Sequence, residues 1–332
     1  MLRAGVIGVG RLGSAHAGCY VKIPEVELAG IFDSNGKLRE EVAGQHGCEA
    51  YPSLDSLLGE IDIASVAVPT ISHFEVAKRC LDKGVHVLIE KPFTTTVSQA
   101  EQLLRLSQKR GLKLQVGHIE RFNPAFLAAR EHIENPMFIE THRLAQFNPR
   151  GTDVDVVLDL MIHDLDLISH LVGQPLTDLQ ASGVGVITES DDIANVRLNF
   201  RGGCVANLTA SRISAKKMRK MRLFQKDAYI SIDFLNRKSE LYKLISIAEG
   251  DSKVSEETIV GKIPVADSGK TILYSQLRIQ EVDMLLSEVN SFVRAVKEDT
   301  TPEVPPEAGL EALTLALTTI EAINAHKRTL SA

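Results

Sequence analysis

The chain has 332 residues, of which 44% are hydrophobic and 24% are charged. At roughly 100 to 200 residues per domain, this length predicts about two domains with their own cores, and the composition excludes a disordered or fibrous chain. The formal net charge of −6 lacks the basic excess that nonspecific binding to nucleic acid or to an anionic membrane requires. We therefore expect a small-molecule partner, with neither nucleic acid nor membrane.

The four cysteines lie far apart and form no CxxC pair, a pattern that fits neither a zinc site nor a disulfide-rich scaffold. The N-terminus enters a strand-like run at Arg3 without a cleavable signal pattern. No segment approaches the roughly 18 to 20 uninterrupted apolar residues of a membrane span. We therefore expect a cytoplasmic protein with reduced thiols and no metal centre.

Up to about residue 120, short apolar runs alternate with segments of helical periodicity. The predicted strands are 3–9, 27–32, 63–68, 86–89 and 114–117. The clearest predicted helices are 11–23, 72–83 and 97–110. Because the strands are continuous apolar runs, as a sheet buried on both faces requires, residues 1–120 predict a parallel sheet between two layers of helices.

After a predicted linker helix at 123–134, the pattern changes to longer strands of mixed polarity. These strands are 137–145, 176–186, 193–200, 205–211, 218–225 and 228–233. Further helices are predicted at 156–171, 275–298 and 306–327, with a hairpin or loop at 248–271. For residues 121–332 we predict a second α/β domain with a large, open, mostly antiparallel sheet, whose last helix packs back near the domain junction.

Gly8, Gly10 and Gly13 form a GxGxxG pattern between a predicted strand and a predicted helix. Glycines with this spacing permit a tight turn, close approach to a pyrophosphate and close helix packing, and the helix N-terminus attracts phosphate. Asp33 follows the second strand, 20 residues beyond Gly13, where it can accept hydrogen bonds from an adenosine ribose. The alternative is an ordinary turn with Asp33 as a helix cap. The correct spacing between the glycine pattern and Asp33 favours a dinucleotide site. Because Asp33 would repel a 2′-phosphate and Ser34–Asn35 supplies no arginine to bind one, NAD is favoured over NADP.

We expect further cofactor contacts from the turn after the first strand and from residues that follow three later strands. These residues are Arg11, Leu12, Pro69, Thr70, His73, Glu90, Lys91 and His118.

Lys91 follows the strand 86–89, so it is predicted at the carboxyl edge of the parallel sheet, where ligands bind in such folds. A lysine there can donate a hydrogen bond to a substrate hydroxyl and stabilise the oxygen as it becomes a ketone. The alternative is a surface lysine that pairs with Glu90.

Asp159 and His163 are four residues apart in a segment of helical periodicity, so they are predicted to share a helix face. The near-neutral pKa of histidine suits His163 to take a proton, while Asp159 orients the ring or holds the substrate. A partly buried histidine with an incidental carboxylate neighbour is the alternative.

The chain resembles the glucose-fructose oxidoreductase, inositol dehydrogenase and rhizopine catabolism (Gfo/Idh/MocA) family. Four segments carry this resemblance, in chain order: 8–13, 90–92, 117–118 and 159–164. The resemblance extends over nearly the whole chain. It implies a Rossmann domain followed by an α/β domain with a large open sheet, and NAD(P)-dependent oxidation of a sugar or cyclitol secondary hydroxyl. It also implies that Lys91, Asp159 and His163 act at the site.

The stretches 117–124 and 142–153 are similar to family members that oxidise the 3-hydroxyl of UDP-N-acetylglucosamine. A UDP-sugar carries a pyrophosphate, for which Arg121, Arg143 and Arg150 can supply cations. For Arg121 and Arg143, structural ion pairs are the alternative. The expected substrate contacts are Lys91, Arg121, Asn123, Arg143, Arg150, Asp159 and His163.

The sequence therefore predicts an NAD-dependent oxidoreductase acting on a CH–OH group, most simply the 3-hydroxyl of a UDP-N-acetylhexosamine. Alternatives are a dehydrogenase of inositol or another free sugar or cyclitol, and a non-catalytic NAD-binding regulator, against which the intact Lys91, Asp159 and His163 argue. Whether Lys91 or His163 is the ultimate base stays open. A homodimer or homotetramer is expected, because the second sheet would otherwise leave one face in water.

Overall fold

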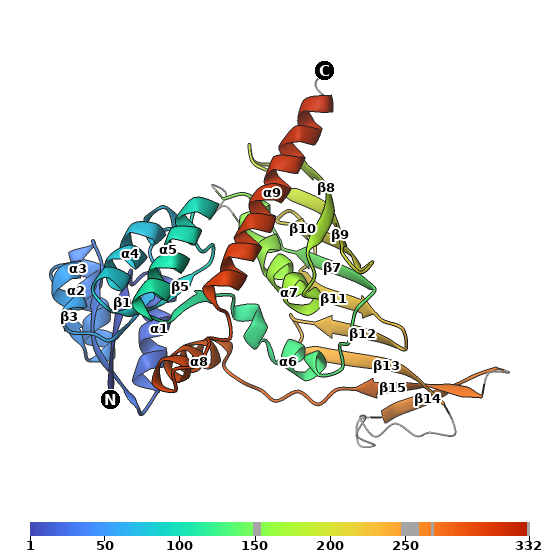
Figure 1. Ribbon diagram of the computed structural model, residues 1–332, viewed down its shortest axis with the longest axis horizontal. Helices are drawn as coiled ribbons and strands as arrows, with labels where there is room; N and C mark the ends of the chain where they lie inside the picture. The colour runs from blue at the N-terminus through green and yellow to red at the C-terminus, as the bar shows by residue number, and fades with distance from the viewer. Residues whose placement is uncertain (149–153, 247–258, 267–268, 331–332) are drawn as a thin grey trace. The chain divides into compact units, whose positions relative to one another are not determined.

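The computed structural model describes residues 1–148, 154–246, 259–266 and 269–330 (Figure 1). The chain forms two compact units. The first unit contains Met1–Ile119 and Asp283–Thr314, and the second contains Glu120–Val282 and Leu315–Ala332.

The first unit is built on a six-stranded sheet in which all neighbouring strands are parallel. Its strand order is β3-β2-β1-β4-β5-β6. The strands are β1 Leu2–Ile7, β2 Val26–Phe32, β3 Glu49–Ala50, β4 Ile63–Val66, β5 His86–Glu90 and β6 Leu114–Gly117. The order reverses at β1, between β2 and β4, and ligands of such sheets bind outside the carboxyl ends of the strands at this reversal.

Helices connect these strands as the alternating pattern predicts. The connecting helices are α1 Arg11–Val21, α2 Gly36–His46, α3 Leu54–Leu58, α4 His73–Asp82 and α5 Val97–Arg110, with a short 3₁₀ turn at Thr70–Ser72. Helix α8 Met284–Lys297 joins the same unit from a later part of the chain. Local signals set several ends. The Thr96 side chain caps α5 by accepting a hydrogen bond from the Gln99 N–H, and Gly111 ends this helix in the left-handed conformation.

The C-terminal part of the chain departs from a simple division at residue 120, because Asp283–Thr314 returns to the first unit. The reason is packing: Val289, Phe292 and Val293 of α8 are buried in the same core as Val6 and Tyr20. The predicted helix 275–298 is also wrong in its first part. Residues up to Gln276 belong to a strand, and α8 begins only after Asp283, whose side chain caps it.

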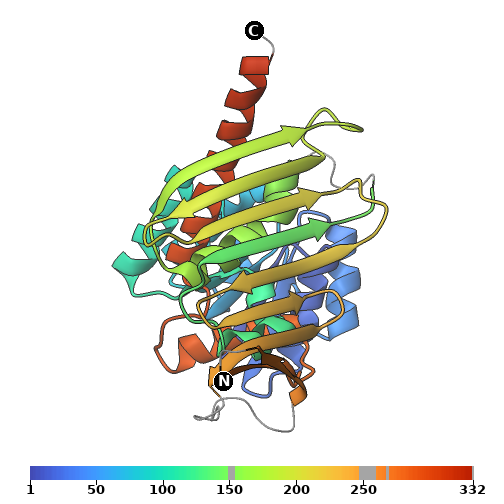
Figure 2. The same ribbon diagram turned by 90° about the vertical axis from the view of Figure 1, so that its right-hand side faces the viewer.

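The second unit contains a nine-stranded sheet with the order β14-β15-β13-β12-β11-β7-β10-β9-β8 (Figure 2). Its neighbouring strands are antiparallel except for the parallel pair β7 and β10. The strands are β7 Phe138–Leu144, β8 Leu176–Val184, β9 Ile193–Phe200, β10 Val205–Ser211, β11 Met218–Phe224, β12 Ala228–Asp233, β13 Lys238–Ser246, β14 Ile259–Val265 and β15 Lys270–Gln276. The predicted α/β fold with a parallel sheet and a large, mostly antiparallel sheet is confirmed.

The helices of the second unit lie on one face of this sheet. They are a 3₁₀ turn Ile119–Phe122, α6 Pro124–Arg130, a π-helical turn Val157–Met161, α7 Ile162–Val172 and the C-terminal part of α9 Pro306–Leu330. Alternate residues of β7, such as Ile139 and Thr141, are buried toward the helices. Figure 2 looks onto the opposite face, which no helix of the described residues covers. No described helix has the length and apolar character needed to cross a bilayer.

Candidate active site

The three glycines after β1, Gly8, Gly10 and Gly13, differ in what surrounds the position that a side chain would occupy. A Cβ atom on Gly13 would lie 1.8 Å from the Gly8 carbonyl oxygen, so α1 could not pack this closely with any other residue. Gly8 has a φ of +82°, and a Cβ atom there would lie 2.8 Å from the Ala67 carbonyl oxygen. At Gly10, by contrast, no described protein atom outside residues 9–11 lies within 4 Å of the Cβ position. This open space, beside the first turn of α1, fits the phosphates of a dinucleotide.

Two further features of the turn support this fit. Arg11 and Leu12 are exposed at the start of α1, and Gly10, the residue before it, provides no side-chain cap. The first N–H groups of the helix are therefore not satisfied by a capping side chain, and the positive end of the helix dipole faces the open space.

Asp33, at the end of β2, joins two loops of the predicted cofactor site. Its Oδ2 accepts a hydrogen bond from the Val9 N–H and its Oδ1 accepts one from the Asn35 N–H, both at 2.8 Å. A carboxylate has about four lone-pair sites, so each oxygen retains capacity for a ribose hydroxyl.

Arg39 is a neighbour of Asp33 that the sequence analysis missed. Its guanidinium donates a hydrogen bond to the Asp33 backbone carbonyl at 3.0 Å. Arg39 lies one helical turn into α2. Had this helix been predicted from the sequence, its first turn would have placed Arg39 near Asp33.

The remaining predicted cofactor residues follow β4 and β6. Pro69 is exposed and Thr70 half-buried, whereas His73 and His118 are buried. The two ring nitrogens of His73 lie 2.9 Å from the carbonyl oxygens of Pro92 and Val68. His73 therefore joins two loops from within the unit.

Glu90 and Lys91 take different positions at the end of β5. The Glu90 carboxylate is buried, and its Oε1 lies 2.8 Å from Nε2 of His16. Potential ligand atoms of His16, Glu90 and Glu288 lie within 4.8 Å of one another. Glu288 comes from α8, so only the fold brings it to this cluster. Lys91 is half-buried and is followed by a cis peptide bond to Pro92.

Asp159 and His163 lie on the π-turn and the first turn of α7, where both side chains are half-buried. The Ile162 N–H bonds to the Val157 carbonyl, a five-residue step that marks the wider π geometry. Such turns occur frequently at functional sites. The Nδ1 atom of His163 is buried.

Arg121 and Arg143 form the structural ion pairs that the sequence analysis gave as the alternative. Buried Arg121 makes two hydrogen bonds to Asp166, at 2.6 and 2.8 Å. Buried Arg143 makes two to Asp164, at 2.8 and 3.0 Å, and one to Glu120 at 2.8 Å. Burial alone would lower the pKa of Arg143, but the two carboxylates raise it, so this arginine stays charged.

The other two residues predicted only as substrate contacts are Asn123 and Arg150. Asn123 is buried and caps α6, because its Oδ1 accepts a hydrogen bond from the Ala125 N–H at 3.0 Å and its amide donates to Glu120. Its side chain thus has a structural role. Arg150 lies outside the described residues.

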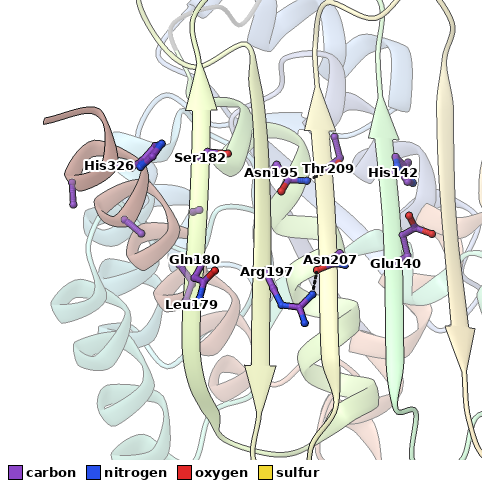
Figure 3. Close-up of a pocket in the computed structure, with 13 residues that line it drawn as sticks. Glu140, His142, Leu179, Gln180, Ser182, Asn195, Arg197, Asn207, Thr209 and His326 are labelled. Atoms are coloured by element: carbon purple, nitrogen blue, oxygen red, sulfur yellow. Dashed lines mark hydrogen bonds between the residues drawn. The ribbon is translucent and has the colours of Figure 1, made fainter. Parts of the chain in front are cut away.

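A separate hollow of about 880 Å³ lies on the open face of the nine-stranded sheet (Figure 3). Most of its lining side chains are polar, and two pairs of them bond across strands: Asn195 donates to Thr209 at 2.9 Å, and Arg197 donates to Asn207 at 3.2 Å. None of the predicted site residues that the structure describes lines this hollow.

Comparison with known proteins identifies the family. Residues 2–118 match the oxidoreductase family with an NAD-binding Rossmann fold, GFO/IDH/MocA, and residues 130–231 match the GFO/IDH/MocA C-terminal domain. The chain belongs to the GFO/IDH/MocA family. Its first unit is accordingly an NAD-binding Rossmann domain, which confirms the predicted cofactor, and the protein is an oxidoreductase.

Individual relatives differ in how similar they are to the chain. A UDP-N-acetylglucosamine 3-dehydrogenase from Acidithiobacillus ferrooxidans is 46% identical over 242 residues, which cover 73% of this chain and 77% of the relative. A solved structure of UDP-N-acetylglucosamine 3-dehydrogenase GnnA from that organism superposes with a TM-score of 0.86 at 38% identity and covers 98% of both chains. A myo-inositol 2-dehydrogenase from Thermotoga maritima is 26% identical and covers 95% of this chain and 94% of its own.

Proposed function

We propose that the protein oxidises the 3-hydroxyl of UDP-N-acetylglucosamine to a ketone, with NAD as the hydride acceptor. The observation that carries the proposal is the 46% identity to a dehydrogenase of this substrate, against 26% to an inositol dehydrogenase. A dehydrogenase of inositol or another free sugar is the second candidate, favoured by the inositol dehydrogenases among the relatives.

The residues of the first unit hold the cofactor in this proposal. Gly10 and the N-terminus of α1 receive the pyrophosphate, and Asp33 accepts hydrogen bonds from the adenosine ribose. Bound NAD supplies the acceptor for the hydride that leaves the carbinol carbon.

Three residues act on the sugar in this proposal. His163 takes the hydroxyl proton at Nε2, and Asp159 orients the ring or holds a sugar hydroxyl. Lys91 donates a hydrogen bond from Nζ to the oxygen and stabilises the negative charge that it gains as the carbonyl forms. Positioned proton transfer of this kind contributes about 10² to 10⁴ in rate.

Arg150 remains the proposed cation for the substrate pyrophosphate, on the strength of the sequence resemblance. Arg121 and Arg143 instead stabilise the fold around the site through buried ion pairs with carboxylates. Removal of one partner of such a pair lowers stability, because the other charge is left buried and unpaired.

A panel of substrates tests the proposal. Purified protein with NAD is mixed separately with UDP-N-acetylglucosamine, N-acetylglucosamine and myo-inositol, and reduced nicotinamide is followed by absorbance. We expect reduction with the sugar nucleotide and none with the other two. Reduction by inositol or the free sugar alone would favour the second candidate.

We also propose that the protein is a cytoplasmic homodimer or homotetramer that associates through the open face of the nine-stranded sheet. All four cysteines are free thiols, as is usual in a reducing compartment. Five rings form a row across that face, with neighbouring centroids 4.6 to 5.8 Å apart: Phe138, Phe224, Tyr229, Tyr242 and Tyr274. Light scattering should show Tyr242→Lys shifted toward the monomer, whereas Gln102→Lys on α5 keeps the wild-type mass.

A further inference from the structure

The turn that carries Lys91 is held on both sides by a buried histidine. His16 lies in α1 and His73 begins α4, two helices of the first unit (Figure 1). Each histidine is only 1% exposed. His16 contacts the side chain of the residue before Lys91, and His73 contacts the carbonyl of the residue after it. The lysine itself contributes to neither contact.

A chain of hydrogen bonds fixes the proton of His16. The Tyr20 hydroxyl lies 2.9 Å from Oγ of Ser65, which lies 3.1 Å from Nδ1 of His16. Burial raises the pKa of Tyr20, so this hydroxyl keeps its proton, and Ser65 is the partner available to it among the described residues. If Tyr20 donates to Ser65, then Ser65 donates to Nδ1, and Nε2 carries the N–H.

His16 therefore donates its Nε2 proton to Oε1 of Glu90, at 2.8 Å. The other carboxylate oxygen, Oε2, lies against Gly117, where an added Cβ atom would come within 3.0 Å of it. Glu90 is thus bonded on one oxygen, and its other oxygen faces Gly117, where any larger residue would crowd it. Because residues 90 and 91 are consecutive, the backbone that carries Lys91 is fixed by this side chain.

His73 holds the other side of the turn. Its two ring nitrogens lie 2.9 Å from the carbonyl oxygens of Pro92 and Val68. Carbonyl oxygens only accept hydrogen bonds, so the neutral ring donates to one of them at a time and the protonated ring donates to both. Val68 directly precedes Pro69 and Thr70, the loop predicted to contact the cofactor.

We propose that His16 and His73 are positioning residues that aim Lys91 at the reacting oxygen. This inference rests on the proposed role of Lys91. Together the two histidines connect the lysine turn to the helix after the glycine turn and to the loop after β4, which are the two parts of this unit expected to hold the dinucleotide. The catalytic lysine and the cofactor loops are thereby joined in one hydrogen-bonded assembly.

A pair of variants at position 73 tests the inference. His73→Leu keeps side-chain volume but removes both contacts, and we expect kcat to fall about 10²-fold, the effect of a misplacement of about 1 Å. The KM for the sugar should change little, because Lys91 acts on the transition state. His73→Gln restores one N–H donor and should recover about tenfold of the loss. The corresponding changes His16→Leu and His16→Gln should show the same order.

His86 provides the matched control. It begins β5, the strand that Lys91 follows, and its Nδ1 accepts a hydrogen bond from the Lys113 N–H at 2.8 Å. Because it lies at the opposite end of this strand, His86→Leu should lower stability but leave kcat near the wild-type value. Equal losses of kcat in His73→Leu and His86→Leu would overturn the inference in favour of a general structural effect.

A second readout does not depend on the sugar. The Lys91 amine is labelled by reductive methylation with an isotope-labelled reagent, and its NMR signal is assigned by its absence in Lys91→Arg. We expect the signal to shift in His73→Gln and to stay unchanged in His86→Gln. An unchanged Lys91 signal together with wild-type kcat in His73→Gln would overturn the inference, and this also decides the matter if His73→Leu does not fold.

The two proposals fail in different ways. If Lys91→Met turns over like the wild type, then the role proposed for Lys91 is wrong, whatever the histidine variants do. If Lys91→Met abolishes turnover while both histidine series retain it, the proposed function stands and the positioning role is wrong.

Discussion

The edge of the cofactor site carries two opposite charges whose balance sets the choice between NAD and NADP. The Asp33 carboxylate would repel a 2′-phosphate, while the Arg39 guanidinium lies against the Asp33 backbone. In our proposal the Asp33 carboxylate is the group that faces the ribose. Removal of that charge therefore leaves a cation beside the 2′ position.

We expect Asp33→Ser to shift the ratio of kcat/KM values for the two cofactors toward NADP by about 10 to 10²-fold, since a charge-assisted hydrogen bond contributes about 1.5 to 3 kcal/mol. Steady-state kinetics with both cofactors measure this ratio. The double variant Asp33→Ser with Arg39→Gln is the control and should lose the gain. A preference for NAD that survives unchanged in Asp33→Ser would show that Asp33 does not set it.

His163 is the proposed base, so His163→Asn should bind NADH with wild-type affinity yet turn over about 10² to 10⁴ times more slowly. Fluorescence titration of NADH and steady-state turnover measure the two effects separately. Full activity in this variant would remove His163 from the mechanism.

Single residues could be predicted where spacing along the chain carries the signal. Gly8, Gly13 and Asp33 are predicted as cofactor residues because a glycine pattern and an acidic residue follow consecutive strands at the expected interval. The sequence did not reveal that Asp166 and Asp164 neutralise Arg121 and Arg143. Such partners come together only through the fold.

Two glycines in the turn after β1 separate folding from cofactor binding. Gly13→Ala would place a Cβ atom 1.8 Å from the Gly8 carbonyl oxygen, so the backbone must move. The Cβ atom of Gly10→Ala meets no described protein atom within 4 Å outside residues 9–11, and it fills only the space that we assign to phosphate.

We therefore expect Gly13→Ala to lower the melting temperature and weaken NADH binding, and Gly10→Ala to weaken NADH binding with little change in melting temperature. Gly13→Ala should lower the free energy of unfolding by about 1 to 3 kcal/mol, the range for an overpacked site. Thermal melts and NADH titrations of both variants check this. Wild-type NADH binding by Gly10→Ala would place the phosphates elsewhere.

Strands and helices were predictable where local sequence and packing agree. Helix α5 and strands β9, β10 and β12 have the predicted bounds, because caps and apolar patterns mark their ends. The predicted helix 275–298 starts too early. Ser275 and Gln276 belong to β15, which pairs with β13, and a long-range pairing of this kind leaves no local mark.

The pH dependence of stability follows from two histidines of the first unit. Burial lowers the pKa of His73 and of His86 below the usual 6.5, although carbonyl contacts oppose this at His73 and Asp62 opposes it at His86. Both rings are therefore neutral in the folded protein at pH values where the unfolded chain already takes up protons. The contribution of these two histidines to the free energy of unfolding is fully present above pH 6.5. It is lost as the pH falls toward their folded-state pKa values.

We expect the free energy of unfolding, measured by denaturant titration, to decrease between about pH 7.5 and about pH 5.5. His86→Gln should show a shallower decrease than the wild type, because one of the two groups no longer titrates. An increase in stability on acidification through this range would contradict the assignment of both histidines.

In the reaction that we propose for the whole molecule, a hydride passes from carbon 3 of UDP-N-acetylglucosamine to bound NAD. The most direct measurement is a single turnover with substrate deuterated at that carbon, followed by mass spectrometry of the reduced nicotinamide. We predict that the reduced cofactor carries the deuterium. Reduced cofactor without deuterium, or no reduction by this substrate while inositol reduces NAD, would contradict the account.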